Sequence, residues 1–171
     1  MLDRDLDRVL DQGFLEDVER LDEEGLRARR DKCVAVEAKV SFLRRLAQGR
    51  LDIVAAEIDR RANGGTAGDL SDLVEHLPQI LADRSRPPGP GRMPTNLQPP
   101  DDPDLTSELD AISGPSALGS VPEMSPSDLE GVSERLRAFE RRVSSQRQAV
   151  FDVIDVIQKE LTSRFQEPER S

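Results

Sequence analysis

Two long stretches of the sequence repeat apolar residues at intervals of three and four, and no proline interrupts either repeat. This spacing forms a narrow seam along a helix, as in a coiled coil, rather than the broad apolar face of a globular helix. The first seam comprises Leu26, Cys33, Val36, Val40, Leu43, Ala47, Leu51, Val54 and Ile58. The second comprises Leu129, Val132, Leu136, Phe139, Val143, Val150, Ile154, Ile157, Leu161 and Phe165. The sequence therefore predicts an all-α fold with two long helices.

Capping residues mark the ends of both helices. Asp22 is placed to cap the first helix, and "RRANGG" ends it with basic side chains and two glycines. Ser125 is placed to cap the second, with Pro126 at its first position. We expect five segments: a short amphipathic segment at 1–21, the first long helix at 22–63, a short helix plus proline-rich flexible linker at 64–125, the second long helix at 126–167, and a tail at 168–171.

The segments outside the long helices are short. Residues 1–21 carry more apolar surface, including Leu6, Leu10 and Phe14, than one short helix can bury. This segment either docks a partner or folds back on the coiled coil as a third helix. "DLVEHLPQIL" and "DLTSELDAIS" are further short helical stretches that flank the linker, and the first of them is a second candidate docking surface.

Composition excludes several classes of function. Aromatic residues make up 3% of the chain and charged residues 34%, which is typical of long helices around a narrow seam. The net charge of −10 argues against direct DNA binding and suits a basic partner. With one cysteine and one histidine, the chain has no disulfide pair and no metal-ligand cluster. We expect no cofactor metal and no catalysis, since no glycine-rich phosphate loop or paired nucleophile and base is present.

The location follows from the same survey. No apolar run approaches ~18 residues, which excludes a membrane span, and the acidic start "MLDRDLDRVL" does not resemble a signal peptide. We expect a cytoplasmic protein.

A row of residues, polar except at Phe151, runs beside each seam, each one position after a seam position. Gln146, which precedes Arg147, interrupts the second seam once. At about 100° per residue, the first row falls within a sector of roughly 80°. It consists of Glu37, Ser41, Arg44, Gln48 and Asp52. The second row, 103 residues later, consists of Glu140, Ser144, Arg147, Phe151 and Asp155. The same interval relates Glu57 to Glu160 and Arg61 to Arg164.

Antiparallel pairing would bring the two rows to one groove, whereas parallel pairing would place them on opposite sides. The linker permits either. Arginine can hold guanine O6 and N7 or a phosphate, and a carboxylate accepts from the guanine N–H groups. Two such rows suit a ligand with two guanines and two phosphates. The alternative is that the rows form interhelical ion pairs, but Ser41, Ser144 and the mid-helix Gly49 add nothing to such a ladder.

The pattern Glu-x3-Ser-x2-Arg-x3-Gln-x3-Asp of the first row resembles the signature of the actinobacterial cyclic-di-GMP-dependent anti-sigma factors that restrain the sporulation sigma factor WhiG. The second row departs from it at Phe151. The resemblance implies two antiparallel helices that hold cyclic-di-GMP, two molecules by analogy, and sequester a WhiG-type sigma factor from RNA polymerase. The competing interpretation is a coiled-coil adaptor or scaffold that works without ligand.

The resemblance also implies a role for each site residue. Arg44 and Arg147 would contact guanine or phosphate, and Asp52 and Asp155 would bind guanine edges. The other polar positions would complete the wall of the site: Glu37, Ser41, Gln48, Glu140 and Ser144. The position of Phe151 allows two interpretations, a ring that stacks on a base or a side chain packed at the margin of the seam.

Overall fold

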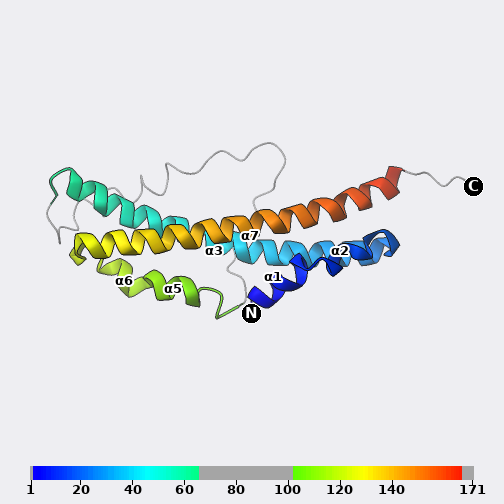
Figure 1. Ribbon diagram of the computed structural model, residues 1–171, viewed down its shortest axis with the longest axis horizontal. Coiled ribbons are helices and arrows are strands. Elements are labelled where there is room, and N and C mark those ends of the chain that lie inside the picture. Colours follow the sequence, from blue (N-terminus) through cyan, green and yellow to red (C-terminus); the bar gives the residue numbers. More distant parts are fainter. Residues whose placement is uncertain (1, 66–101, 167–171) are drawn as a thin grey trace, which may run out of the picture. The chain divides into compact units, whose positions relative to one another are not determined.

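The computed structural model describes residues 2–65 and 102–166, and every regular element in these ranges is helical (Figure 1). The prediction of an all-helical chain with two long helices is confirmed. In chain order the elements are α1 (Leu2–Leu10), α2 (Gly13–Glu16), the 3-10 turn η1 (Val18–Arg20), α3 (Glu23–Ala62), α5 (Ser107–Ser113), α6 (Pro115–Gly119), the 3-10 turn η2 (Val121–Glu123) and α7 (Pro126–Gln166).

Helix α3 begins and ends as its sequence predicts. The carboxylate of Asp22 accepts a hydrogen bond of 2.8 Å from the backbone N–H of Gly25, which satisfies one of the free donors of the first turn. At the other end Gly64 has a φ of 92°, a conformation that favours glycine. The N–H groups of Gly65 and Gly64 donate to the carbonyls of Arg60 and Arg61 at 3.0 and 3.1 Å. These two bonds close the last turn of the helix.

Helix α7 is capped by Ser125. Its hydroxyl accepts from the backbone N–H of Asp128 at 3.2 Å and donates to the carboxylate of Asp128 at 2.6 Å. The predicted cap is confirmed, and Pro126 occupies the first helical position, where its missing N–H costs no hydrogen bond.

The described chain separates into two compact units, and both long helices contribute to each. Unit 1 contains residues 2–42, 102–105 and 143–166, which include α1, α2, η1, the first half of α3 and the second half of α7. Unit 2 contains residues 43–65 and 106–142, which include the second half of α3, α5, α6, η2 and the first half of α7.

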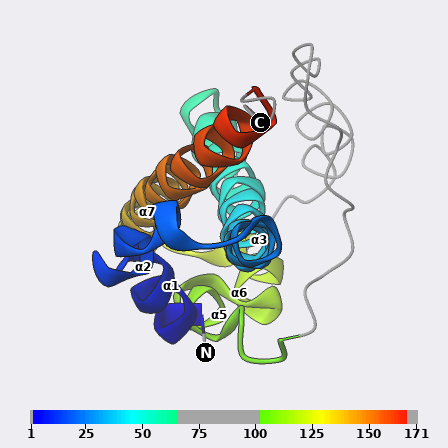
Figure 2. The same cartoon turned by 90° about the vertical axis from the view of Figure 1, so that its right-hand side faces the viewer.

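In unit 1 the N-terminal segment folds back on α3. Leu6, Val9 and Val18 are buried, and α1 and α2 lie alongside α3 in both views (Figure 1 and Figure 2). The ammonium of Lys39 on α3 binds the carboxylate of Asp5 on α1 at 3.0 Å. Of the two alternatives for residues 1–21, the structure shows the short helices packed on the long one, with Leu10 left 38% exposed.

In unit 2 the short helix α5, drawn below α7 in Figure 1, contacts both long helices, through Arg50 of α3 and Arg142 of α7. Leu109 of α5 and Val121 of η2 are buried, as are the seam residues Val54 of α3 and Leu129 of α7. The helix expected from "DLTSELDAIS" is present as α5. Helix α6 and η2 were not predicted, since residues 64–125 were expected to form a short helix plus a proline-rich flexible linker. The stretch "DLVEHLPQIL" lies outside the described residues.

The apolar seams of α3 and α7 supply most of the core. Their buried members include Leu26, Cys33, Val36, Val40, Leu43, Ala47, Val54, Leu129, Val132, Leu136, Phe139, Val143, Val150, Ile157 and Leu161. Three predicted members, Leu51, Ile58 and Ile154, are only half-buried. Val153 is buried although the sequence did not place it on the seam. Burial raises the pKa of the Cys33 thiol to about 11, so this cysteine packs as a small apolar residue.

Candidate functional site

In unit 1 the polar rows of the two long helices contact each other around Arg147. The Nε of Arg147 on α7 donates to the carboxylate of Glu37 at 3.1 Å and to the hydroxyl of Ser41 at 2.9 Å, both on α3. The Ser41 hydroxyl donates in turn to Glu37 at 2.5 Å. The guanidinium carbon of Arg147 lies 4.5 Å from the ring centroid of Phe151. Glu37, Ser41, Arg147 and Phe151 are called the Arg147 cluster below.

In unit 2 the same residue types contact each other around Arg44. The Nε of Arg44 on α3 lies 3.3 Å from the carboxylate of Glu140 on α7. The side-chain amide of Gln48, one turn along α3, donates to the same oxygen at 3.1 Å. Arg44, Gln48 and Glu140 are called the Arg44 cluster below. Each cluster thus joins an arginine from one motif copy to the glutamate of the other copy.

The arginine of the Arg147 cluster keeps its outer edge clear of the residues that the structure describes. Both of its hydrogen bonds to residues within 2–65 and 102–166 start from Nε, so no group in these ranges accepts from Nη1 or Nη2. The side chain as a whole is 32% exposed. Two parallel N–H groups at the end of a fixed guanidinium match a carboxylate, a phosphate or the O6/N7 edge of guanine.

The remaining predicted site residues lie on the same helices. Asp52 in unit 2 and Ser144 in unit 1 are half-buried, and Asp155 in unit 1 is exposed. Space is present over Gly49 on α3, since a Cβ placed there would meet no atom within 4 Å. Packing in this structure therefore does not require glycine at position 49.

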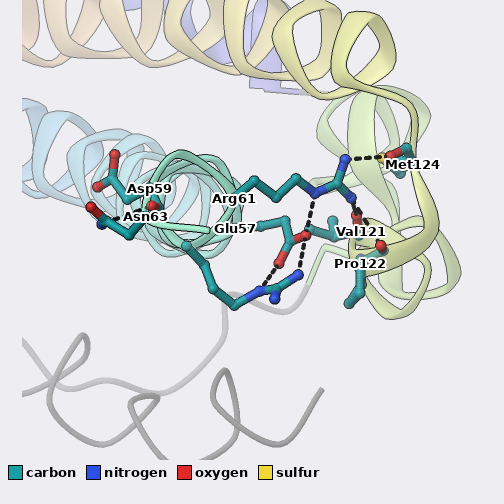
Figure 3. A network of polar contacts seen from close by, with 8 residues as sticks. Glu57, Asp59, Arg61, Asn63, Val121, Pro122 and Met124 are labelled. Atoms are coloured by element: carbon teal, nitrogen blue, oxygen red, sulfur yellow. Dashed lines mark hydrogen bonds and ion pairs between the residues drawn. The ribbon is translucent and has the colours of Figure 1, made fainter. Parts of the chain in front are cut away.

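Glu57 forms a second polar network at the end of α3, in unit 2 (Figure 3). Its side chain is fully buried and accepts from Arg60 at 2.9 Å and from Arg61 at 2.5 Å. Arg61 also donates to the carbonyls of Met124 at 2.7 Å and Pro122 at 2.9 Å, just before α7. Hydrogen bonding from Arg60, reinforced by Arg61, lowers the pKa of the Glu57 carboxyl. The network fixes the end of one long helix to the start of the other.

Unit 1 has a matching network at the end of α7. Arg164 donates to the carboxylate of Glu160 at 2.8 Å, to the carbonyl of Glu19 at 3.0 Å and to the carbonyl of Leu21, just before α3. The sequence interval of 103 residues relates Glu57 to Glu160, Arg61 to Arg164 and Leu21 to Met124. Sequence analysis found the repeated glutamate and arginine but not their role, because their acceptors are backbone carbonyls that leave no pattern in the sequence.

A buried arginine in unit 2 was missed altogether. Arg50 is 9% exposed and donates to the carbonyls of Leu109 at 2.9 Å and Ser113 at 2.6 Å. It also binds the Asp110 carboxylate at 2.5 Å, and this hydrogen bond lowers the pKa of Asp110. Its position on α3, outside both the seam and the polar row, gave no signal that α5 would cover it.

Among the described residues no group of three or more histidine, cysteine, aspartate or glutamate side chains is arranged to hold a metal ion. Within the same ranges no helix is sufficiently long and apolar to cross a bilayer.

Comparison with known proteins identifies one family. A search of curated proteins gives no match to the chain. A family model described as RsiG-like matches residues 12–81, which include η1, α3 and the complete first motif copy. The second copy on α7 lies outside the matched residues. RsiG is an anti-sigma factor, and its family is regulatory rather than enzymatic. This match agrees with the predicted resemblance over residues 12–81 and is consistent with the RsiG anti-sigma factor family.

Proposed function

We propose that this protein is an anti-sigma factor that binds cyclic-di-GMP and sequesters a WhiG-type sigma factor from RNA polymerase in the cytoplasm. The RsiG-like match over residues 12–81 supports the anti-sigma role. The observation that carries the ligand assignment is the reciprocal pairing of the motif copies, with Arg147 against Glu37 in unit 1 and Arg44 against Glu140 in unit 2.

The contacts within each unit support an antiparallel coiled coil of α3 and α7. In unit 1 Arg164, at the end of α7, reaches the residues before α3, while Arg147 reaches Glu37 further along α3. In unit 2 Arg44 meets Glu140, while Arg61 at the end of α3 reaches the residues before α7. In both units, residues nearer the end of α3 contact residues nearer the start of α7, as expected for helices that run in opposite directions. This direction gives each cluster one arginine and one glutamate from different helices.

Each cluster has the groups that guanine requires. An arginine edge can donate to O6 and N7 of the base, and a glutamate can accept from its ring N–H and amino group. The Nε of each arginine faces the glutamate of its cluster, so a bound base would accept hydrogen bonds from the arginine Nη groups and donate its own to the carboxylate. We infer one cyclic-di-GMP molecule at each cluster, with Asp52 and Asp155 as further acceptors for guanine edges.

The charge of the chain suits the proposed partner. Sigma factors present basic surfaces to DNA, and a protein with a net charge of −10 can compete for such surfaces. The acidic excess would speed association with the sigma factor. The same excess disfavours binding to the DNA backbone.

Calorimetric titration with cyclic-di-GMP tests the ligand assignment. We expect two molecules bound per chain, and Arg44→Ala or Arg147→Ala to weaken binding at one site by about 1–3 kcal/mol for the lost bidentate contact. Arg142→Ala is the matched control, because Arg142 is an exposed α7 arginine whose ion pair is with Glu108, outside both clusters. Full binding by both cluster variants would exclude the proposed site.

The second candidate is a ligand-independent coiled-coil adaptor. It is favoured by the Arg44–Glu140 and Arg147–Glu37 pairs, which already satisfy both arginines at Nε without any ligand. Capture of a purified WhiG-type sigma factor with and without cyclic-di-GMP separates the two. We expect capture to require the nucleotide, whereas an adaptor would capture equally well in its absence.

A further inference from the structure

Phe151 is the one position at which the second motif copy departs from the first. It stands 103 residues after Gln48, where the first copy has an amide. A phenyl ring can neither donate nor accept the hydrogen bonds of a glutamine side chain. The departure therefore raises the question of whether the Arg147 cluster has lost a contact or gained a different one.

The ring lies against the arginine of its own cluster. The guanidinium carbon of Arg147 is 4.5 Å from the centroid of Phe151, within the range in which a cation is attracted to an aromatic face. Glu37 and Ser41 hold the Nε of the same guanidinium at 3.1 and 2.9 Å. Arg147 is thus restrained at one face by the ring and at one edge by hydrogen bonds.

In the Arg44 cluster Gln48 restrains the arginine indirectly, through Glu140. Its amide donates to the Glu140 oxygen that also faces Arg44, at 3.1 Å from the amide and 3.3 Å from the Arg44 Nε. The glutamine therefore fixes the carboxylate, and the carboxylate fixes the arginine. In the Arg147 cluster the Ser41 hydroxyl already donates to the Glu37 carboxylate at 2.5 Å. Residue 151 is therefore not needed to hold the carboxylate and can contact the arginine itself.

We propose that Phe151 is a positioning residue of the nucleotide site, which holds the plane of Arg147 so that Nη1 and Nη2 face the ligand. This role rests on the proposed function. The ring replaces the amide by orienting the arginine directly, and it removes rotational freedom that Arg147 would otherwise lose when ligand binds.

Titration of three variants at position 151 of the full chain with cyclic-di-GMP tests the proposal. Phe151→Leu keeps an apolar side chain but removes the aromatic face, and we expect binding at one of the two sites to weaken about 3- to 10-fold. Phe151→Tyr keeps the ring and should stay within about 2-fold of the unaltered chain. Phe151→Gln also removes the aromatic face and, because Ser41 already fixes the Glu37 carboxylate, should weaken binding about as much as Phe151→Leu. A role in apolar packing alone would instead tolerate Leu best and Gln worst.

A spectroscopic readout reports the stacking without ligand. The Nε–H resonance of Arg147 should carry a ring-current shift that is lost in Phe151→Leu and retained in Phe151→Tyr. Arg142→Ala removes the arginine that lies over Phe139 at 5.0 Å and should alter neither nucleotide binding nor the Arg147 resonance. Thermal melting confirms that each variant folds, which position 151 should permit because the ring is only half-buried.

The outcomes separate this role from the proposed function. Nucleotide binding by the unaltered chain, with Phe151→Leu weakened and Phe151→Tyr restored, supports both. Binding by the unaltered chain that Phe151→Leu leaves unchanged overturns the positioning role alone. Absence of binding by the unaltered chain overturns the proposed function, and the role of Phe151 with it.

Discussion

Unit 1 and unit 2 contain the same sequence of parts but bury their charged groups to different extents. The 103-residue interval relates η1 to η2, Asp22 to Ser125, and the Lys39–Asp5 pair to the Arg142–Glu108 pair. In unit 2 the Glu57 side chain is fully buried and Arg50 is 9% exposed. In unit 1 the counterpart of Glu57, Glu160, has a side chain 24% exposed, and the counterpart of Arg50 is the apolar Val153.

The comparison separates the features that both units share from those that one unit has alone. The helix caps, the arginines that hold the opposite helix start, and the arginine–glutamate pairs of the two clusters occur twice. The buried ion pairs of Glu57 and Arg50 belong to unit 2. We infer that the shared features support the common fold and ligand chemistry, while the additional buried charges make unit 2 more dependent on complete ion pairing.

The largest expected effect is at the two helix ends. Glu57→Gln leaves Arg60 and Arg61, whose side chains are 10% and 17% exposed, without their carboxylate. We expect it to reduce the free energy of unfolding by about 3 kcal/mol. Glu160→Gln, the matched control in unit 1, should cost about 1 kcal/mol or less because its pair is partly solvated. Urea denaturation measures both, and equal losses would refute the stated difference between the units.

Arg50→Val gives unit 2 the residue that unit 1 has at the equivalent position. The change leaves the carbonyls of Leu109 and Ser113 and the carboxylate of Asp110 without their buried donor. We expect a loss of about 2 kcal/mol in the free energy of unfolding. An unchanged midpoint of urea denaturation would show that α5 does not depend on this arginine.

Gly49 has no glycine counterpart in unit 1, where position 152 is an aspartate. Gly49→Ala should raise the free energy of unfolding by about 1 kcal/mol, because alanine is the better helix former and its Cβ meets open space. If nucleotide lies over this turn, the same variant should bind cyclic-di-GMP more weakly. Gly131→Ala on α7, which also meets open space, is the matched control and should stabilise without a change in binding.

The pH dependence of stability should also differ between the units. The pKa values of Glu57 and Asp110, both in unit 2, are lowered by hydrogen bonds from arginine. Their stabilisation is therefore complete above the ordinary values of 4.5 for Glu57 and 3.8 for Asp110, and is lost as the pH falls through the lowered values of the folded chain. In unit 1 hydrogen bonding to Asp5 raises the pKa of Lys39, so its contribution is lost at alkaline pH. Thermal melts between pH 7 and 3 should show a smaller acid loss for Glu57→Gln than for the unaltered chain.

The sequence predicted the features whose causes are local. Cap residues such as Asp22 and Ser125 act within four positions, and the seam spacing of three and four reflects the helical period itself. The polar rows followed from the same period. The sequence did not select the interhelical partners, since the choice of Glu37 for Arg147 depends on the direction and register of the other helix.

The parts that were missed depend on tertiary covering. Nothing adjacent to Arg50 or Glu57 in the chain indicates burial, because α5 and the residues before α7 enclose them from about 60 positions away. Helix α6 and η2 were obscured by proline and glycine, which also fit a linker. Ile154 was expected on the buried seam, but it is only half-buried and the preceding residue, Val153, is buried. A narrow seam permits such a shift by one residue.

The central claim is that both arginine clusters bind cyclic-di-GMP. The most direct measurement is the NMR spectrum of the arginine Nε–H groups during titration of the full chain, since the Nε of Arg44 faces Glu140 and that of Arg147 faces Glu37 in the free protein. The account predicts that both resonances shift with saturable nucleotide binding while that of Arg142 stays in place. Two cluster resonances that remain unmoved at saturating nucleotide would contradict it.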